Sequence, residues 1–142
     1  MKRIAIALLL TIIAATAVQA ATISELQTGV YTIGDIVDVS GVIVVGINGT
    51  SSNGFYIAEA PYGATNGVYA YGPNAGVAVG DIIDIVGGEY DEYYDLTELK
   101  TFDAMVTVVS SGNALPAPSM MTADELYADA EPWEGCAIML TD

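Results

Sequence analysis

The chain has 142 residues, and 18 acidic residues against three basic ones and no histidine give it a formal net charge of −15. One cysteine, no histidine and a single arginine at position 3 exclude Ser-His-Asp and Cys-His catalysis, zinc sites built from His and Cys, arginine clamps on phosphate and the P-loop lysine motif. We therefore expect that this chain is not itself an enzyme.

The first twenty residues have the pattern of a secretory signal peptide. Lys2 and Arg3 precede an apolar run, 4–13, and a small-residue stretch that ends at Ala20. Cleavage after Ala20 would leave Lys100 as the last basic residue, in a secreted or periplasmic protein. No later segment approaches the ~20 apolar residues of a membrane span, so no membrane contact is expected after cleavage. Cys136 has no cysteine partner in the chain, and it is either a small buried side chain or a thiol whose partner lies elsewhere.

A short helical turn and then a change to strand periodicity are expected next. Thr22 and Glu25 form a capping box that opens the turn. Residues 34–41 (GDIVDVSG) and 80–87 (GDIIDIVG) then repeat one pattern, in which aliphatic residues alternate with an outward aspartate. Both copies predict the start of a strand. The glycine that closes each copy is expected at a sharp bend, as a small closed barrel requires.

Three more strands complete the expected sheet. An Asn-Gly turn opens a strand at 55–59, a second strand follows at 67–71, and residues 89–95 are expected at a hairpin tip. The last strand is expected from about 96 to 109, interrupted near Asp103. This order predicts an all-β protein, a five-stranded Greek-key barrel of the oligonucleotide/oligosaccharide-binding (OB) type, with a short N-terminal helical turn and a C-terminal helix plus strand.

The expected organisation is a signal peptide at 1–20, an OB domain at 21–113, a Pro-rich linker at 114–121 and a further unit at 122–142. This last unit opens with a second capping box, Thr122 with Glu125, and an apolar strand follows. Two interpretations stay open for it. The unit is either the start of a second, truncated β unit or a C-terminal clamp on the barrel.

Four stretches, 79–85, 89–99, 112–118 and 133–135, resemble the OB-fold modules that precede the catalytic domain in secreted bacterial nucleases of the endonuclease/exonuclease/phosphatase type. The resemblance covers about residues 23 to 140. It implies a non-catalytic exported accessory module that positions nucleic acid or a neighbouring domain, with a downstream catalytic domain as partner. That domain's metal-binding His, Asp, Asn and Glu have no counterparts here. The alternative is a free-standing exported binding or scaffolding module for a glycan, peptide or protein.

The candidate ligand-binding residues are tyrosines. Alternation places Tyr56, Tyr69 and Tyr71 on the face opposite the expected core, where an OB barrel holds its ligand. They form either a stacking platform for bases or sugars or ordinary cross-strand packing pairs. Nucleic-acid binding is expected to be weak or cation-dependent, because one lysine neutralises at most one phosphate and the net negative charge repels a polyanion.

The acidic tip supplies the remaining candidates. Tyr93 and Tyr94 extend the possible ligand surface, and Asp91, Glu92 and Asp95 carry the oxygen ligands that Ca²⁺ or Mg²⁺ prefers. The alternative is an acidic tip that is simply solvated. No other cofactor is expected.

Overall fold

The computed structural model describes residues 19–48 and 53–142, so all but the last two residues of the predicted leader lie outside the described residues. The elements in chain order are β1 (Gln19–Ala20), α1 (Ile23–Gln27), β2 (Ile36–Ile47), β3 (Phe55–Ala58), β4 (Gly67–Tyr71), β5 (Ile82–Tyr93), β6 (Leu96–Lys100), β7 (Met105–Ser110), β8 (Ser119–Thr122), α2 (Ala123–Ala128), the 3-10 turn η1 (Glu131–Trp133) and β9 (Ile138–Thr141). No described helix is long and apolar enough to cross a membrane.

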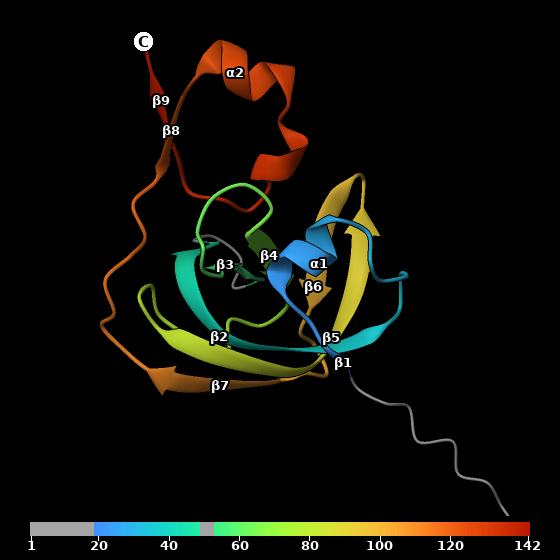
Figure 1. The fold of residues 1–142 in the computed structure, drawn as a ribbon. Helices are drawn as coiled ribbons and strands as arrows, with labels where there is room; N and C mark the ends of the chain where they lie inside the picture. Colours follow the sequence, from blue (N-terminus) through green and yellow to red (C-terminus); the bar gives the residue numbers. More distant parts are fainter. Residues whose placement is uncertain (1–18, 49–52) are drawn as a thin grey trace, which may run out of the picture.

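Strand pairing closes five strands into a barrel, β2 to β6, which Figure 1 labels. β2 pairs antiparallel with both β3 and β5, β3 pairs antiparallel with β4, and β5 pairs antiparallel with β6. The one parallel contact of the barrel joins β4 to β6. The circular order β2-β3-β4-β6-β5-β2 is that of an OB-type Greek-key barrel, so the predicted fold class is confirmed.

The barrel core is built from the inward residues of each strand, and α1 closes one end of it. Thr22 and Glu25 form the predicted capping box, which fixes the start of α1. Ile23 and Leu26 on α1 are fully buried against the barrel residues. The largest fully buried barrel side chains are Phe55, Ile57, Ile83, Ile85 and Leu99.

The two matching sequence segments bind each other. Asp84 accepts a hydrogen bond from the Gly41 backbone at 2.8 Å, and Asp38 accepts one from the Gly87 backbone, also at 2.8 Å. Gly41 and Gly87 have positive φ angles of 70° and 79°, which favour glycine. β2 shifts register between residues 39 and 42, so the bend predicted at Gly41 is confirmed. The repeated segment therefore holds β2 and β5 together where both strands turn.

The structure divides the expected fifth strand in two. β6 lies between β4 and the second half of β5, and the chain then turns back so that β7 pairs with the first half of β5. β5 can pair with β7 along its first half and with β6 along its second half because it bends at Gly87. The hairpin tip is also shorter than predicted: β5 runs to Tyr93, and only Tyr94 and Asp95 form the turn, both with positive φ.

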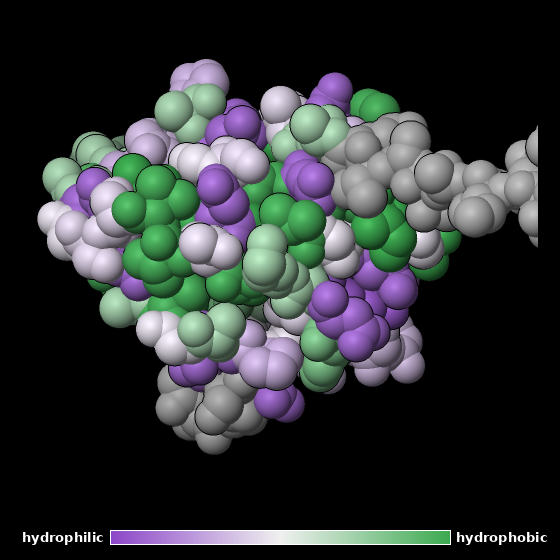
Figure 2. All heavy atoms as spheres, turned by 90° about the horizontal axis from the view of Figure 1, so that it is seen from below, coloured by the Kyte–Doolittle hydropathy of each residue, from purple (hydrophilic) through white to green (hydrophobic). Residues whose placement is uncertain are grey.

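β7 lies outside the closed barrel and leaves much of its surface uncovered. Met105, Val108 and Val109 are all exposed. Figure 2 views the molecule from below, the side on which β7 lies in Figure 1, and shows apolar groups there separated by polar ones. Interspersed polar groups of this kind limit edge-to-edge association of an exposed strand.

The C-terminal residues form a small unit that touches the barrel. β8 and β9 pair in parallel, and α2 between them begins at the predicted capping box of Thr122 and Glu125. The Cys136 thiol donates to the Gly63 carbonyl at 3.1 Å, and the Glu134 carboxylate accepts from the Thr97 backbone at 3.1 Å. The unit thus contacts both the loop after β3 and the start of β6.

We expect the Asp38 and Asp84 carboxylates to contribute to stability. Asp38→Ala and Asp84→Ala should each lower the free energy of unfolding by about 1.5 kcal/mol, because each leaves a backbone N–H without its charged acceptor. Asp38→Asn keeps an acceptor oxygen and should lose less. Urea unfolding monitored by circular dichroism measures the difference. Asp103→Ala, at an exposed loop position, is the control for the general relief of charge repulsion. An equal loss of stability in this variant would contradict the stabilising role of Asp38 and Asp84.

Close backbone packing holds the C-terminal unit on β4. A Cβ atom at Gly135 would lie 2.7 Å from the Val68 nitrogen. Gly135→Ala should therefore loosen this contact and raise the reaction rate of the Cys136 thiol with a disulfide reagent. Gly112→Ala is the matched control, because Gly112 also has positive φ but no atom within 4 Å of its Cβ position. Equal thiol reaction rates in both variants would mean that the close contact at Gly135 does not hold the C-terminal unit on β4.

Candidate functional site

The outer surface of β3, β4, β6 and the second half of β5 carries one continuous set of side chains. The strand registers align Tyr56 with Tyr69, Tyr69 with Glu98, and Glu98 with Asp91, which makes a row across four strands. A second row aligns Tyr71, Lys100 and Glu89. We call this surface the tyrosine face, made of Tyr56, Tyr69, Tyr71, Glu89, Asp91, Glu98 and Lys100.

The tyrosines of this face pack on one another. Tyr56 and Tyr69, whose ring centroids lie 4.9 Å apart, are a cross-strand pair, and the Tyr69 and Tyr71 rings are stacked at 6.2 Å. Phe102 meets the Tyr71 ring edge-on at 5.0 Å. Tyr69 is 7% exposed, and its hydroxyl donates to the Asn53 carbonyl at 2.6 Å. Tyr69 thus packs beneath the more exposed Tyr56 and Tyr71, as the cross-strand packing interpretation expects, and the role of the tyrosines as a stacking platform stays a prediction.

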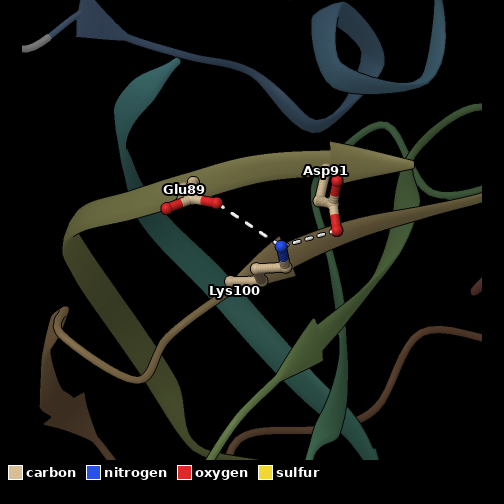
Figure 3. Close-up of polar contacts among 3 residues, drawn as sticks. All are labelled: Glu89, Asp91 and Lys100. Carbon is tan, nitrogen blue, oxygen red and sulfur yellow. Dashed lines mark hydrogen bonds and ion pairs between the residues drawn. The ribbon is translucent and has the colours of Figure 1, made fainter. Parts of the chain in front are cut away.

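Lys100 is held by two carboxylates, as Figure 3 shows. Its Nζ lies 2.7 Å from Asp91 Oδ2 and 3.4 Å from Glu89 Oε1. The hydrogen bond from Lys100 lowers the pKa of Asp91, and the same bond raises the pKa of Lys100. The only lysine outside the predicted leader is therefore already neutralised on this face.

Glu98 differs from its neighbours because it is buried. It is 6% exposed and has no hydrogen bond or ion pair to any residue in the described part of the chain. Burial raises the pKa of its carboxyl group, and the nearby negative charge of Asp91 raises it further. The positive charge of Lys100 acts in the opposite direction on this pKa, so the fold keeps a partly desolvated carboxylate beside tyrosine rings.

The face encloses a hollow of about 370 Å³, lined by Tyr69, Tyr71, Asp91, Tyr93, Glu98 and Lys100. Three of the five predicted ligand-binding tyrosines therefore meet here. Tyr56 lines a neighbouring hollow of about 270 Å³ between β2 and the C-terminal unit. Tyr94 is 88% exposed at the hairpin turn and packs edge-on against Tyr93 at 4.7 Å. Ligand binding by these residues stays a prediction.

The candidate metal ligands are engaged in separate contacts. Asp91 pairs with Lys100, whereas Glu92 accepts hydrogen bonds from the Tyr90 and Thr97 hydroxyls, each at 2.7 Å. Asp95 lies in the hairpin turn. Within residues 19–48 and 53–142, no group of three or more His, Cys, Asp or Glu side chains is placed to hold a metal ion. The predicted Ca²⁺ or Mg²⁺ site thus gains no geometric support.

Sequence reasoning missed Glu98 and Phe102 as parts of the site. Alternation along β6 does indicate that Glu98 and Lys100 share a face. The predicted OB barrel places β4 and β6 side by side, but strand periodicity does not set the register between them, and this register brings Glu98 beside Tyr69. Phe102 follows β6 in a loop without periodicity, so only its contact with Tyr71 identifies it.

Comparison with known proteins agrees with the fold. No protein-family model matches the chain, and no curated protein matches it significantly. A murine DNA-binding protein solved with double-stranded DNA has a TM-score of 0.50 and 17% identity over 70% of this chain and 52% of that one. At that identity the likeness shows the fold alone.

Two solved OB domains are also similar. The OB domain of a Methanosarcina mazei protein matches with a TM-score of 0.46 and 15% identity, covering 70% of this chain and 93% of that domain. The OB domain of a Thermoplasma acidophilum protein matches with a TM-score of 0.38 and 15% identity, covering 58% of this chain and 82% of that one.

The raised pKa of Glu98 predicts a pH-dependent stability. Because the folded chain holds this proton more tightly than the unfolded chain, stability falls as pH rises past the ordinary glutamate value of 4.5. Glu98→Gln should therefore raise the melting temperature at pH 7, and the gain should disappear below pH 4.5. Differential scanning calorimetry across this range measures it.

Glu131→Gln is the matched control for this measurement, because it removes a carboxylate from an exposed position in η1, away from the hollow. An equal gain in both variants at pH 7 would show general relief of charge repulsion and not the burial of Glu98.

Proposed function

We propose that this chain is a non-catalytic, exported OB-fold accessory module of a nuclease-like protein, which positions a neighbouring domain or partner through its tyrosine face. The observation that carries the proposal is the pair of cross-strand rows that places tyrosines and carboxylates on one outer barrel surface. Aromatic rings beside polar acceptors are the usual composition of a binding surface.

The parent context and the export rest on the sequence. The signal-peptide pattern at 1–20 supports export, and the resemblance of 79–85, 89–99, 112–118 and 133–135 to nuclease-associated modules supports the accessory role. The absence of histidine from the whole sequence supports a module without its own reaction chemistry. Under this proposal, hydrolysis belongs to a separate catalytic domain.

The charge on the face argues against nucleic acid as a tight direct ligand. Single-stranded nucleic acid is normally held by basic side chains together with aromatic platforms. Here Lys100 is paired with Asp91 and Glu89, so almost no counterion release would accompany phosphate binding. Nucleic acid would bind this chain weakly, or through a bridging cation.

The second candidate function is a free-standing exported module for a glycan, peptide or protein. The partly exposed rings of Tyr56 and Tyr71 beside carboxylate acceptors favour it, because such a surface can stack on a sugar ring and accept its hydroxyl hydrogens.

Binding assays on the purified protein separate these functions. Fluorescence anisotropy should show no binding of labelled oligothymidine in EDTA and at most weak binding with Ca²⁺, because the face repels phosphate. A cellohexaose titration run in parallel should be silent under the accessory proposal. Cellohexaose binding that is indifferent to Ca²⁺ would favour the free-standing module.

Paired variants locate any binding that is seen. Tyr71→Ala should abolish it, and Tyr127→Ala, which removes a ring that is 94% exposed on α2, should leave it unchanged. Tight oligothymidine binding in EDTA would contradict the proposal, and so would DNA hydrolysis by the purified protein with Mg²⁺.

A further inference from the structure

The hollow in the tyrosine face lies at the junction of three strands. Tyr69 and Tyr71 come from β4, Asp91 and Tyr93 from β5, and Glu98 and Lys100 from β6. Its volume of about 370 Å³ falls in the range of small-ligand sites, about 300–1,000 Å³. The hollow can therefore admit one side chain of a partner.

The Glu98 carboxylate is a hydrogen-bond acceptor in the lining of the hollow. Glu98 is 6% exposed as a residue, and its side chain lines the hollow. None of its oxygens is both fully buried and without a partner, so its carboxylate reaches solvent through the hollow and is open there to a hydrogen-bond donor. A group that enters the hollow and donates hydrogen bonds would satisfy this carboxylate, and a positive charge would also offset its burial.

The rings around Glu98 favour the same kind of group. Tyr71 is stacked on Tyr69, and it remains half-buried at the wall of the hollow, with Tyr93 on the β5 side. Aromatic faces attract cations, and a planar guanidinium can stack on a ring while it donates hydrogen bonds in its plane.

The charge balance excludes the opposite kind of ligand. Glu89, Asp91 and Glu98 bring three carboxylates to the face, and Lys100 brings one ammonium group. A phosphate or carboxylate would meet excess negative charge, whereas a cation would be attracted both here and by the acidic molecule as a whole.

We propose that this hollow binds an arginine guanidinium from a basic partner surface, which donates to the Glu98 carboxylate and stacks on Tyr71. The proposal rests on the proposed function, because it names what the tyrosine face recognises. This chain cannot supply the group from its described part, since its only arginine is Arg3 in the predicted leader. The partner is therefore a different protein or domain that carries an exposed arginine.

A matched peptide pair tests the charge. The probes are acetyl-Gly-Arg-Gly-amide and the same peptide with citrulline, which keeps the shape of arginine without its charge. NMR titration of the ¹³C-labelled protein follows the Glu98 carboxyl and Tyr71 ring signals. The arginine peptide should shift both signals and bind at least about tenfold more tightly than the citrulline peptide.

Two glutamate variants test the position. Glu98→Gln should weaken binding of the arginine peptide by about tenfold, because the neutral amide loses the charge-assisted pair. Glu131→Gln makes the same chemical change on the exposed η1 and should bind like the wild-type chain. Since Glu98→Gln removes a partly desolvated charge, it should remain folded, which its melting temperature verifies.

The outcomes separate this proposal from the one on which it rests. Equal binding of the two peptides, no detectable binding of the arginine peptide, or equal losses in Glu98→Gln and Glu131→Gln would overturn the arginine site. If cellohexaose shifts the Tyr71 signals and the arginine peptide does not, the arginine site fails and the accessory proposal fails with it in favour of the free-standing module. If the arginine peptide leaves the Tyr71 and Glu98 signals unmoved while cellohexaose and oligothymidine behave as the accessory proposal expects, the arginine site alone fails.

Discussion

The barrel depends on one reciprocal interaction between two copies of the same short sequence. Asp38 binds the backbone at Gly87, and Asp84 binds the backbone at Gly41. Each bond secures the partner strand at its bend, where ladder hydrogen bonding is interrupted and an N–H would otherwise lose its acceptor. Because β5 bends there, its first half pairs with β7 and its second half with β6. The tyrosine face exists only because that second half lies beside β6.

The charge of the chain decides what this face can do. An OB barrel that holds nucleic acid combines aromatic platforms with basic side chains. Here the face carries tyrosine rings, and its basic component is a single lysine bound between two carboxylates. Glu98 adds negative charge to the same surface. Its raised pKa means that its charged form is unfavourable for folding at neutral pH, and yet it lies at the centre of the face. These features fit a surface that selects hydrogen-bond donors and cations over phosphate.

The C-terminal unit repeats the opening of the barrel in structure as well as in sequence. β1 runs parallel to β2 with Gln19 opposite Val37, and β8 runs parallel to β9 with Ser119 opposite Ile138. A capping-box helix lies between the strands in both cases. The difference is in packing: α1 buries two residues in the barrel core, whereas α2 buries none. The same local signals thus form the same local structure with and without a core beneath it.

Local chemistry accounts for what the sequence determined: both capping boxes, the two long strands with their inward aliphatic residues, and the inward Phe55 against the outward Tyr56. Each of these features depends on residues only a few positions apart: a capping box joins residues three apart, and alternation along a strand sets which face each side chain takes. Only the tertiary structure decided that the two segments on either side of the interruption predicted near Asp103 pair with different halves of β5, that the two aspartates bind across the barrel, and that Glu98 lies beside Tyr69. These pairings join residues about 30 to 50 positions apart, and side-chain period sets which face a residue takes but not which strand it meets.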